Sequence, residues 1–207
     1  MKKVFIILGF TFLIIFLSGC LNTLHPIFTE KDLAYDPKFI GIWNTEYQQS
    51  KGKAIISNLA TENSVELPGN ISTMKHKGYF ITYQDEHGDT KQYIAFLARI
   101  GKHLYFDYYP ADKKEDRKLD EFFGVHFVRM HSSYRVEILK DGSFELSQLD
   151  GSYVKSLIDQ KKIAISYETD AEDDITITAS TKELQQYLLK YGDESSAYES
   201  AKTTFKK

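Results

Sequence analysis

The sequence has a single cysteine, few prolines and no low-complexity tract. Cys20 is the only cysteine among 207 residues, so the chain cannot form an internal disulfide or a metal site with more than one thiolate ligand. No repeat of fixed period is present, which argues against solenoids and propellers. The net charge is −3 with both signs mixed, so the basic face that nucleic-acid binding requires is missing. We expect one globular domain that folds without covalent crosslinks and has no nucleic-acid partner.

Signatures of catalysis and of metal binding are absent as well. The chain contains no Gly-x-Ser-x-Gly, no His-Glu-x-x-His and no glycine-rich phosphate loop. His126 and His131 lie five residues apart on an expected strand, so they point to opposite faces and cannot share an ion. The acidic segment 170–174 lacks the spacing of a calcium loop. We expect exposed or capping histidines, no metal and no cofactor, and we rank an enzyme third, below a ligand-binding protein and a structural partner.

The longest apolar run lies at the N-terminus. Lys2 and Lys3 precede the fourteen uncharged, mainly apolar residues 4–17. As a helix this run would span about 21 Å, which is short of the ~30 Å hydrocarbon core of a membrane. The pattern is typical of a signal peptide rather than of a membrane-spanning helix.

The next residues, Leu17-Ser18-Gly19-Cys20, resemble the lipobox of bacterial lipoproteins. The resemblance implies that residues 1–19 are removed and that Cys20 is lipidated, so that the membrane becomes a partner through an N-terminal lipid anchor. Leu21 is not the aspartate that favours inner-membrane retention in enterobacterial lipoproteins. In a cell with two membranes, the outer membrane, with the protein facing the periplasm, is therefore favoured over the inner membrane.

The rest of the chain predicts a mainly β domain, because Tyr and Phe are abundant, with 14 residues of each. We expect a lipidated tether and lead-in over 20–37, a single β-rich domain over 38–192 and a polar flexible tail over 193–207. The first strand is predicted at 40–47, and a closing hairpin at 163–167 and 175–178. A short inserted helix is predicted at 152–160, and a C-terminal helix begins after an N-cap at Ser180 or Thr181, with Glu183 in its first turn.

A predicted hairpin around Gly101 has two possible registers. A three-residue loop ending at Gly101 pairs Ile94 with Phe106 and keeps apolar residues on one face. A two-residue turn would instead place Phe96 opposite Asp107. We expect the three-residue loop, with Gly101 at positive φ.

A second predicted hairpin surrounds Gly142. A three-residue loop ending at this glycine pairs Ile138 with Phe144, and Gly142 is again expected at positive φ. Gly101 and Gly142 are therefore expected to be structural residues.

Gly41-Ile42-Trp43, on the first strand, resembles the Gly-x-Trp signature of lipocalins and related calycin barrels. The resemblance implies an antiparallel barrel or strongly curved sheet in which Gly41 and Trp43 are structural and Trp43 closes one end. The alternative is that Trp43 is a core aromatic of another sheet fold. The mature chain also resembles uncharacterised bacterial lipoproteins that carry a Pro-x-Phe-Thr-x-Lys-Asp-Leu segment, here at 26–33, ahead of Gly-x-Trp.

Two functional hypotheses follow. The first is an envelope lipoprotein that binds a small apolar molecule or lipid, in an enclosed aromatic-lined cavity near Trp43. The alternative is a structural or assembly partner of another envelope protein, whose barrel is filled by its own side chains. One strand face carries His103, Tyr105, Asp107 and Tyr109, which form either a polar groove or the ordinary outer face of a sheet.

Overall fold

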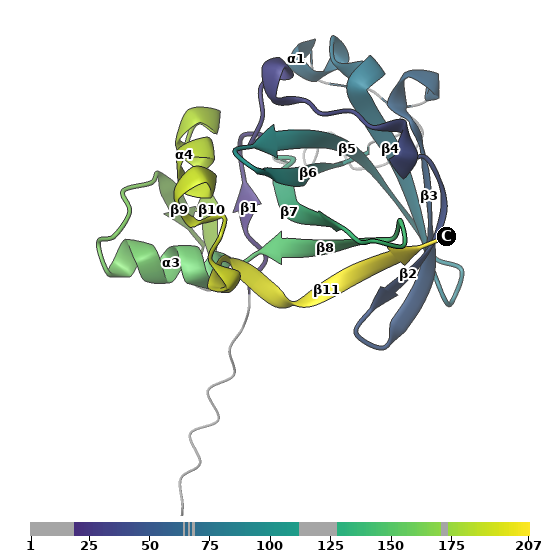
Figure 1. Cartoon of the computed structure of the whole chain (residues 1–207). Coiled ribbons are helices and arrows are strands. Elements are labelled where there is room, and N and C mark those ends of the chain that lie inside the picture. Colours follow the sequence, from purple (N-terminus) through teal and green to yellow (C-terminus); the bar gives the residue numbers. More distant parts are fainter. Residues whose placement is uncertain (1–18, 64, 66, 68, 112–127, 171–173) are drawn as a thin grey trace, which may run out of the picture.

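Eight antiparallel strands form a closed barrel in the computed structural model, which describes residues 19–63, 65, 67, 69–111, 128–170 and 174–207 (Figure 1). The expected signal peptide lies outside the described residues, apart from Gly19. In chain order the barrel strands are β2 (Gly41–Tyr47), β3 (Ser50–Asn58), β4 (Gly78–Asp85), β5 (Thr90–Ile100), β6 (His103–Pro110), β7 (His131–Ile138), β8 (Phe144–Leu149) and β11 (Tyr198–Lys206). Since β6 pairs with β7, and β11 pairs with both β8 and β2, the ring of strands is complete. The expected antiparallel barrel is confirmed.

Aromatic side chains fill the half of the barrel in which β2 begins. Trp43 packs edge-on against Phe144 with ring centroids 4.9 Å apart, and Phe144 stacks on Phe205 at 4.3 Å. Phe39 reaches this cluster from a short 3-10 helix, Pro37–Phe39, and its carbonyl accepts a 2.8 Å hydrogen bond from Trp43 Nε1. We call this filled end the closed end of the barrel.

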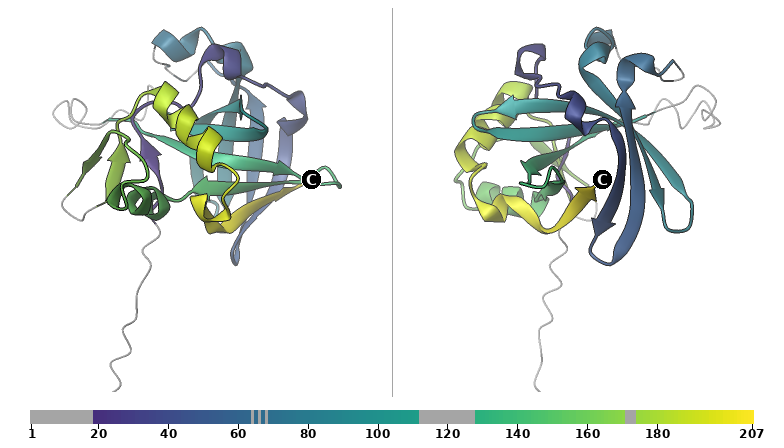
Figure 2. Two further views of the ribbon diagram at one scale, coloured as in Figure 1. Left: turned by 60° about the vertical axis from the view of Figure 1, so that its left-hand side comes forward. Right: turned by 45° about the vertical axis from the view of Figure 1, so that its right-hand side comes forward.

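A second apolar core covers the outer face of β5 and β6. The N-terminal segment 21–33 and helix α4 (Thr181–Tyr191) pack there, and Figure 2 shows α4 lying across the outside of the strands. Phe28 packs against Phe96 with ring centroids 5.0 Å apart, and Leu184 of α4 joins the same cluster. β5 and β6 are therefore buried on both faces.

This double burial explains why the expected register of the Gly101 hairpin is wrong. Phe96 lies opposite Asp107 and Leu97 lies opposite Phe106, so a two-residue turn of Gly101 and Lys102 joins the strands. The register was predicted on the assumption that only one face is apolar, whereas both faces are buried here. Gly101 does have the expected positive φ, at +59°.

The predicted register of the Gly142 hairpin is confirmed. Ile138 pairs with Phe144, and Gly142 has a φ of +84°. The outer residues beside the turn, Glu137 and Glu145, both pair with Lys202, so apolar and charged side chains separate cleanly onto the two faces. Sequence alternation predicts register where only one face is apolar.

A lobe outside the barrel is inserted between β8 and β11. It contains α3 (Gly151–Asp159), β9 (Tyr167–Thr169), β10 (Ile175–Ile177) and α4, and β1 (Asn22–Thr23) links β10 to β7. Both predicted helices are confirmed, and Ser180 caps α4 in a reciprocal capping box with Glu183. The β9–β10 hairpin does not close the barrel, contrary to expectation.

A further short helix, α1 (Gly69–Ser72), lies outside this lobe, between β3 and β4.

The expected flexible tail over 193–207 is also wrong, because most of it is the closing strand β11. Phe205 has no exposed surface, and it pairs with Thr45 on one side and Phe144 on the other. β11 carries few apolar residues, and its inward-facing Thr203 is polar, so it lacks the alternation that indicates a strand.

We predict that Phe205→Ala lowers the free energy of unfolding by about 3–5 kcal/mol, because it leaves a hole in the closed-end cluster. Urea denaturation followed by circular dichroism measures the change. The neighbouring Lys206→Ala, at an exposed position of the same strand, should change stability by less than about 0.5 kcal/mol. Equal losses from the two variants would contradict the role of Phe205.

Candidate functional site

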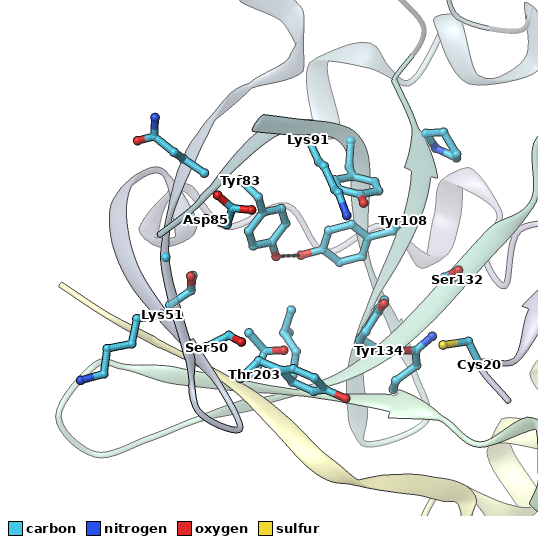
Figure 3. Close-up of a pocket in the computed structure, with 18 of the residues that line it drawn as sticks. Cys20, Ser50, Lys51, Tyr83, Asp85, Lys91, Tyr108, Ser132, Tyr134 and Thr203 are labelled. Atoms are coloured by element: carbon cyan, nitrogen blue, oxygen red, sulfur yellow. Dashed lines mark hydrogen bonds between the residues drawn. The ribbon is translucent and has the colours of Figure 1, made fainter. Parts of the chain in front are cut away.

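A cavity of about 560 Å³ opens at the end of the barrel opposite Trp43 (Figure 3). We call it the open-end cavity. Its base is formed by Tyr83 and Tyr108, whose hydroxyl oxygens lie 3.1 Å apart. Tyr83 also contacts Phe205, so the base rests on the closed-end cluster. The other lining residues are Cys20, Asn22, Thr45, Tyr47, Ser50, Lys51, Gly52, Gln84, Asp85, Lys91, Tyr93, Pro110, Met130, Ser132, Tyr134, Leu146, Gln148 and Thr203.

The cavity exists because the inward-facing residues change character along the strands. On β4, Tyr79 and Ile81 belong to the barrel core, whereas Tyr83 and Asp85 further along the strand line the cavity. Thr45 and Thr203 take the corresponding inward positions on β2 and β11. Residues smaller than the closed-end aromatics leave space at the open end, and their hydroxyl groups make its wall partly polar.

Three tyrosines of the cavity, Tyr83, Tyr108 and Tyr134, remain neutral at physiological pH. Burial raises the pKa of Tyr83, Tyr108 and Tyr134. Tyr108 packs edge-on against Tyr93 and Tyr134, with ring centroids 5.9 and 5.1 Å apart. The base and wall therefore present aromatic faces and uncharged hydroxyls, which suit a ligand with an apolar body and a hydrogen-bonding group.

Charged groups lie at the mouth. Figure 3 shows the amine end of Lys91 directed toward Tyr108, whereas Lys51 extends away from the cavity. Neither lysine forms an ion pair with another residue that the structure describes. Asp85 is held in the β4–β5 turn, where it accepts 2.9 Å hydrogen bonds from two backbone N–H groups. Lys91 is thus placed to pair with an anionic group on a ligand.

Cys20 lies at the mouth of the cavity, with an exposed thiol (Figure 3). Residues 20–37 do not form the expected tether, because the chain is attached to the barrel and its lobe from Cys20 onward. Cys20 forms a β-bridge with Asp150, and Leu21 N–H donates to the Leu149 carbonyl at 3.2 Å. Leu21 is only 2% exposed, which explains why this apolar segment does not stay in solvent.

The residues predicted to be structural lie at the closed end, away from the cavity. Gly41 opens β2 with a φ of +139°, and Gly101 and Gly142 form turns at this end. Trp43 is surrounded by aromatic rings, and the Lys207 amine lies 4.7 Å from its ring centroid. The prediction of an enclosed cavity near Trp43 is therefore wrong, because side chains fill that end of the barrel.

The β6 face expected to offer a polar groove is covered. His103, Tyr105, Asp107 and Tyr109 do share one face, but the last three are buried beneath the second core. His103 alone remains partly accessible, and its Nε2 lies 2.7 Å from an Asp193 oxygen. This face is a structural surface rather than a binding groove.

Asp107 is the centre of a buried polar network that the sequence did not indicate. Its carboxylate accepts hydrogen bonds from Ile27 N–H at 3.0 Å and from Ser133 Oγ at 3.3 Å, and it lies 2.6 Å from His131 Nδ1. His131 is therefore not exposed, contrary to expectation, while His126 lies outside the described residues. Ser133 donates to the carboxylate and not to the imidazole, so the three side chains do not form a nucleophilic relay. The network attaches the N-terminal segment to β6 and β7.

No cluster of three metal-ligating side chains occurs within the described ranges. Across the same residues, no helix combines the length and the apolar character needed to cross a membrane.

We predict that stability falls at alkaline pH because of the buried tyrosines. Their raised pKa values mean that the folded protein keeps protons which the unfolded chain loses above about pH 10. The contribution of these neutral tyrosines to the free energy of unfolding is complete below about pH 10, and it is lost as the pH rises through their pKa values in the folded protein. Urea denaturation between pH 8 and 12 measures the decline, and Tyr83→Phe should make it shallower. Ionisation of every tyrosine near pH 10 in the folded protein, seen by absorbance at 295 nm, would contradict it.

Comparison of the chain with models of protein families, with curated proteins and with solved structures found no match. The resemblances of Leu17-Ser18-Gly19-Cys20 to a lipobox and of Gly41-Ile42-Trp43 to lipocalins therefore stay predictions from the sequence. The closed eight-stranded barrel and its open-end cavity are properties of this chain's own structure.

Proposed function

We propose that this protein is a lipid-anchored envelope protein whose barrel binds a small amphipathic ligand in the open-end cavity. The observation that carries the proposal is the contrast between the two ends of the barrel. Aromatic side chains fill the closed end, whereas the open end keeps about 560 Å³ of accessible, tyrosine-lined space. Ligand pockets commonly measure ~300–1,000 Å³ and combine apolar walls with a few placed polar groups.

The anchor is proposed at Cys20, after removal of residues 1–19. An exposed thiol at the start of the folded body supports this assignment, because modification of its sulfur does not require the barrel to open. More than one acyl chain gives long-lived attachment to a membrane. Since Leu21 replaces the aspartate that favours inner-membrane retention, we place the protein at the outer membrane, facing the periplasm.

The ligand is proposed to have an apolar body and an anionic or hydrogen-bonding end. Tyr93, Tyr108 and Tyr134 offer ring faces for the body, and Leu146 adds aliphatic surface. Lys91 would pair with the charged end. The described residues hold no arrangement suited to nucleophilic or metal-dependent chemistry, so we propose binding rather than catalysis.

The alternative, an assembly partner whose barrel is filled by its own side chains, fits only the closed end. The outer face does carry an exposed apolar pair, Ile42 and Ile55, which lie opposite each other on β2 and β3 and are 64% and 51% exposed. Isolated apolar residues of this kind are normal on protein surfaces. The open-end cavity therefore favours the ligand-binding proposal.

We predict that Thr203→Trp weakens binding of the fluorescent probe anilinonaphthalene sulfonate at least tenfold, or by about 1.4 kcal/mol, because the indole fills the cavity. Fluorescence titration of the purified domain measures the affinity. Thr204→Trp adds the same side chain at the next position, which alternation places on the outer face, and it should leave the affinity within about twofold. Similar binding by both variants would refute this cavity as the site.

We predict further that Lys91→Gln weakens binding of this anionic probe about tenfold, because a charge-assisted hydrogen bond is lost. Binding of uncharged phenylnaphthylamine should change by less than about twofold. Lys53→Gln, an exposed control outside the cavity on β3, should affect neither probe. Equal weakening of both probes by Lys91→Gln would show that the lysine acts through packing instead of charge.

A further inference from the structure

The proposed anchor and the open-end cavity lie at the same end of the barrel. Cys20 lines the mouth, and Figure 3 shows its sulfur pointing toward Tyr134. The β2–β3 hairpin, which carries Tyr47 and Ser50 at the mouth, projects toward the side of the molecule where the described chain begins (Figure 2). A lipid attached to the sulfur would therefore start at the rim of the cavity.

No flexible linker separates this sulfur from the barrel. After removal of residues 1–19, Leu21 N–H still donates to the Leu149 carbonyl at 3.2 Å, and Leu24 N–H donates to the Ile177 carbonyl at 2.8 Å. An extended linker would add about 3.3–3.6 Å of reach per residue, but here the hydrogen bonding already begins at Leu21, the residue after Cys20. A body attached in this way cannot turn its mouth far from the membrane surface.

The side chains at the rim suit a membrane interface. Tyr47 is 41% exposed beside the cavity, and aromatic residues with a polar tip are enriched where lipid headgroups meet hydrocarbon. Lys51 and Lys91 can reach headgroup phosphates through their long side chains. The closed end is different, because Trp43 and its neighbours are buried there and it lies away from Cys20.

We infer that the mouth of the barrel faces the bilayer to which Cys20 is anchored, so that the cavity takes its ligand, a membrane amphiphile, directly from the lipid surface. This inference rests on the proposed lipidation of Cys20. The closed end then points toward the aqueous compartment. Exchange through the mouth would expose little of the ligand's apolar part to water.

The orientation can be tested with tryptophans placed at the two ends. The purified mature lipidated protein is reconstituted into vesicles of phosphatidylethanolamine and phosphatidylglycerol, with or without bromine on the acyl chains. Tyr47→Trp adds an indole at the mouth, and Ile138→Trp adds one at the closed end, where Ile138 is 54% exposed. The native Trp43 serves as an internal reference, since it lies about 13 Å along β2 from position 47.

We expect brominated lipid to quench most of the fluorescence that Tyr47→Trp adds, and to leave Trp43 and Ile138→Trp unchanged. Equal quenching of the two variants, or stronger quenching of Ile138→Trp, would overturn the inference. If the wild-type protein does not float with the vesicles, the proposed anchor fails and the inference fails with it. If it floats and the probe titration still identifies the cavity, but position 47 is not quenched, the orientation alone is wrong.

Discussion

The structure depends on the pairing of β11 with both β8 and β2. Without that strand, the two strands would present unpaired backbone N–H and carbonyl groups and the barrel would be an open sheet. β11 also places Phe205 against Phe144 in the closed-end cluster and Thr203 in the wall of the cavity. One strand therefore closes the barrel, seals one end and leaves the other end hollow.

The fold could be predicted from the sequence where a local signal is unambiguous. The capping box of Ser180 and Glu183 locates α4, and the alternation of apolar with charged residues sets the register around Gly142. The register around Gly101 could not be predicted in the same way, because the N-terminal segment and α4 bury the outer face of that hairpin. The alternation of apolar and polar residues along a strand cannot show that segments distant in the sequence cover its outer face. β11 was missed for a related reason, since its inward-facing Thr203 lines a partly polar cavity instead of an apolar core.

The candidate site could be predicted only in part. The motif identifies Cys20, but its position at the rim of a cavity depends on the hydrogen bond from Leu21 N–H to the Leu149 carbonyl, which only the fold reveals. The Gly-x-Trp motif predicts a cavity near Trp43, at the wrong end of the barrel. An aromatic side chain can fill a barrel interior as well as line a cavity, and its local sequence does not distinguish the two roles. Tyr83 and Tyr108 come together from different strands, and nothing in their local sequence distinguishes them from the many other tyrosines. Anchor, mouth and cavity together form an arrangement suited to a ligand that comes from a membrane.

Mass spectrometry of the native protein, purified from membranes under mild conditions, tests the central claim most directly. The expected result is a chain that begins at Cys20 with diacylglyceryl on the sulfur, together with a co-purifying small amphiphile that Thr203→Trp excludes. A mature chain that begins elsewhere or carries an unmodified sulfur would contradict the anchor. An acylated protein whose cavity is empty under every condition, and that binds no added amphiphile, would contradict the ligand.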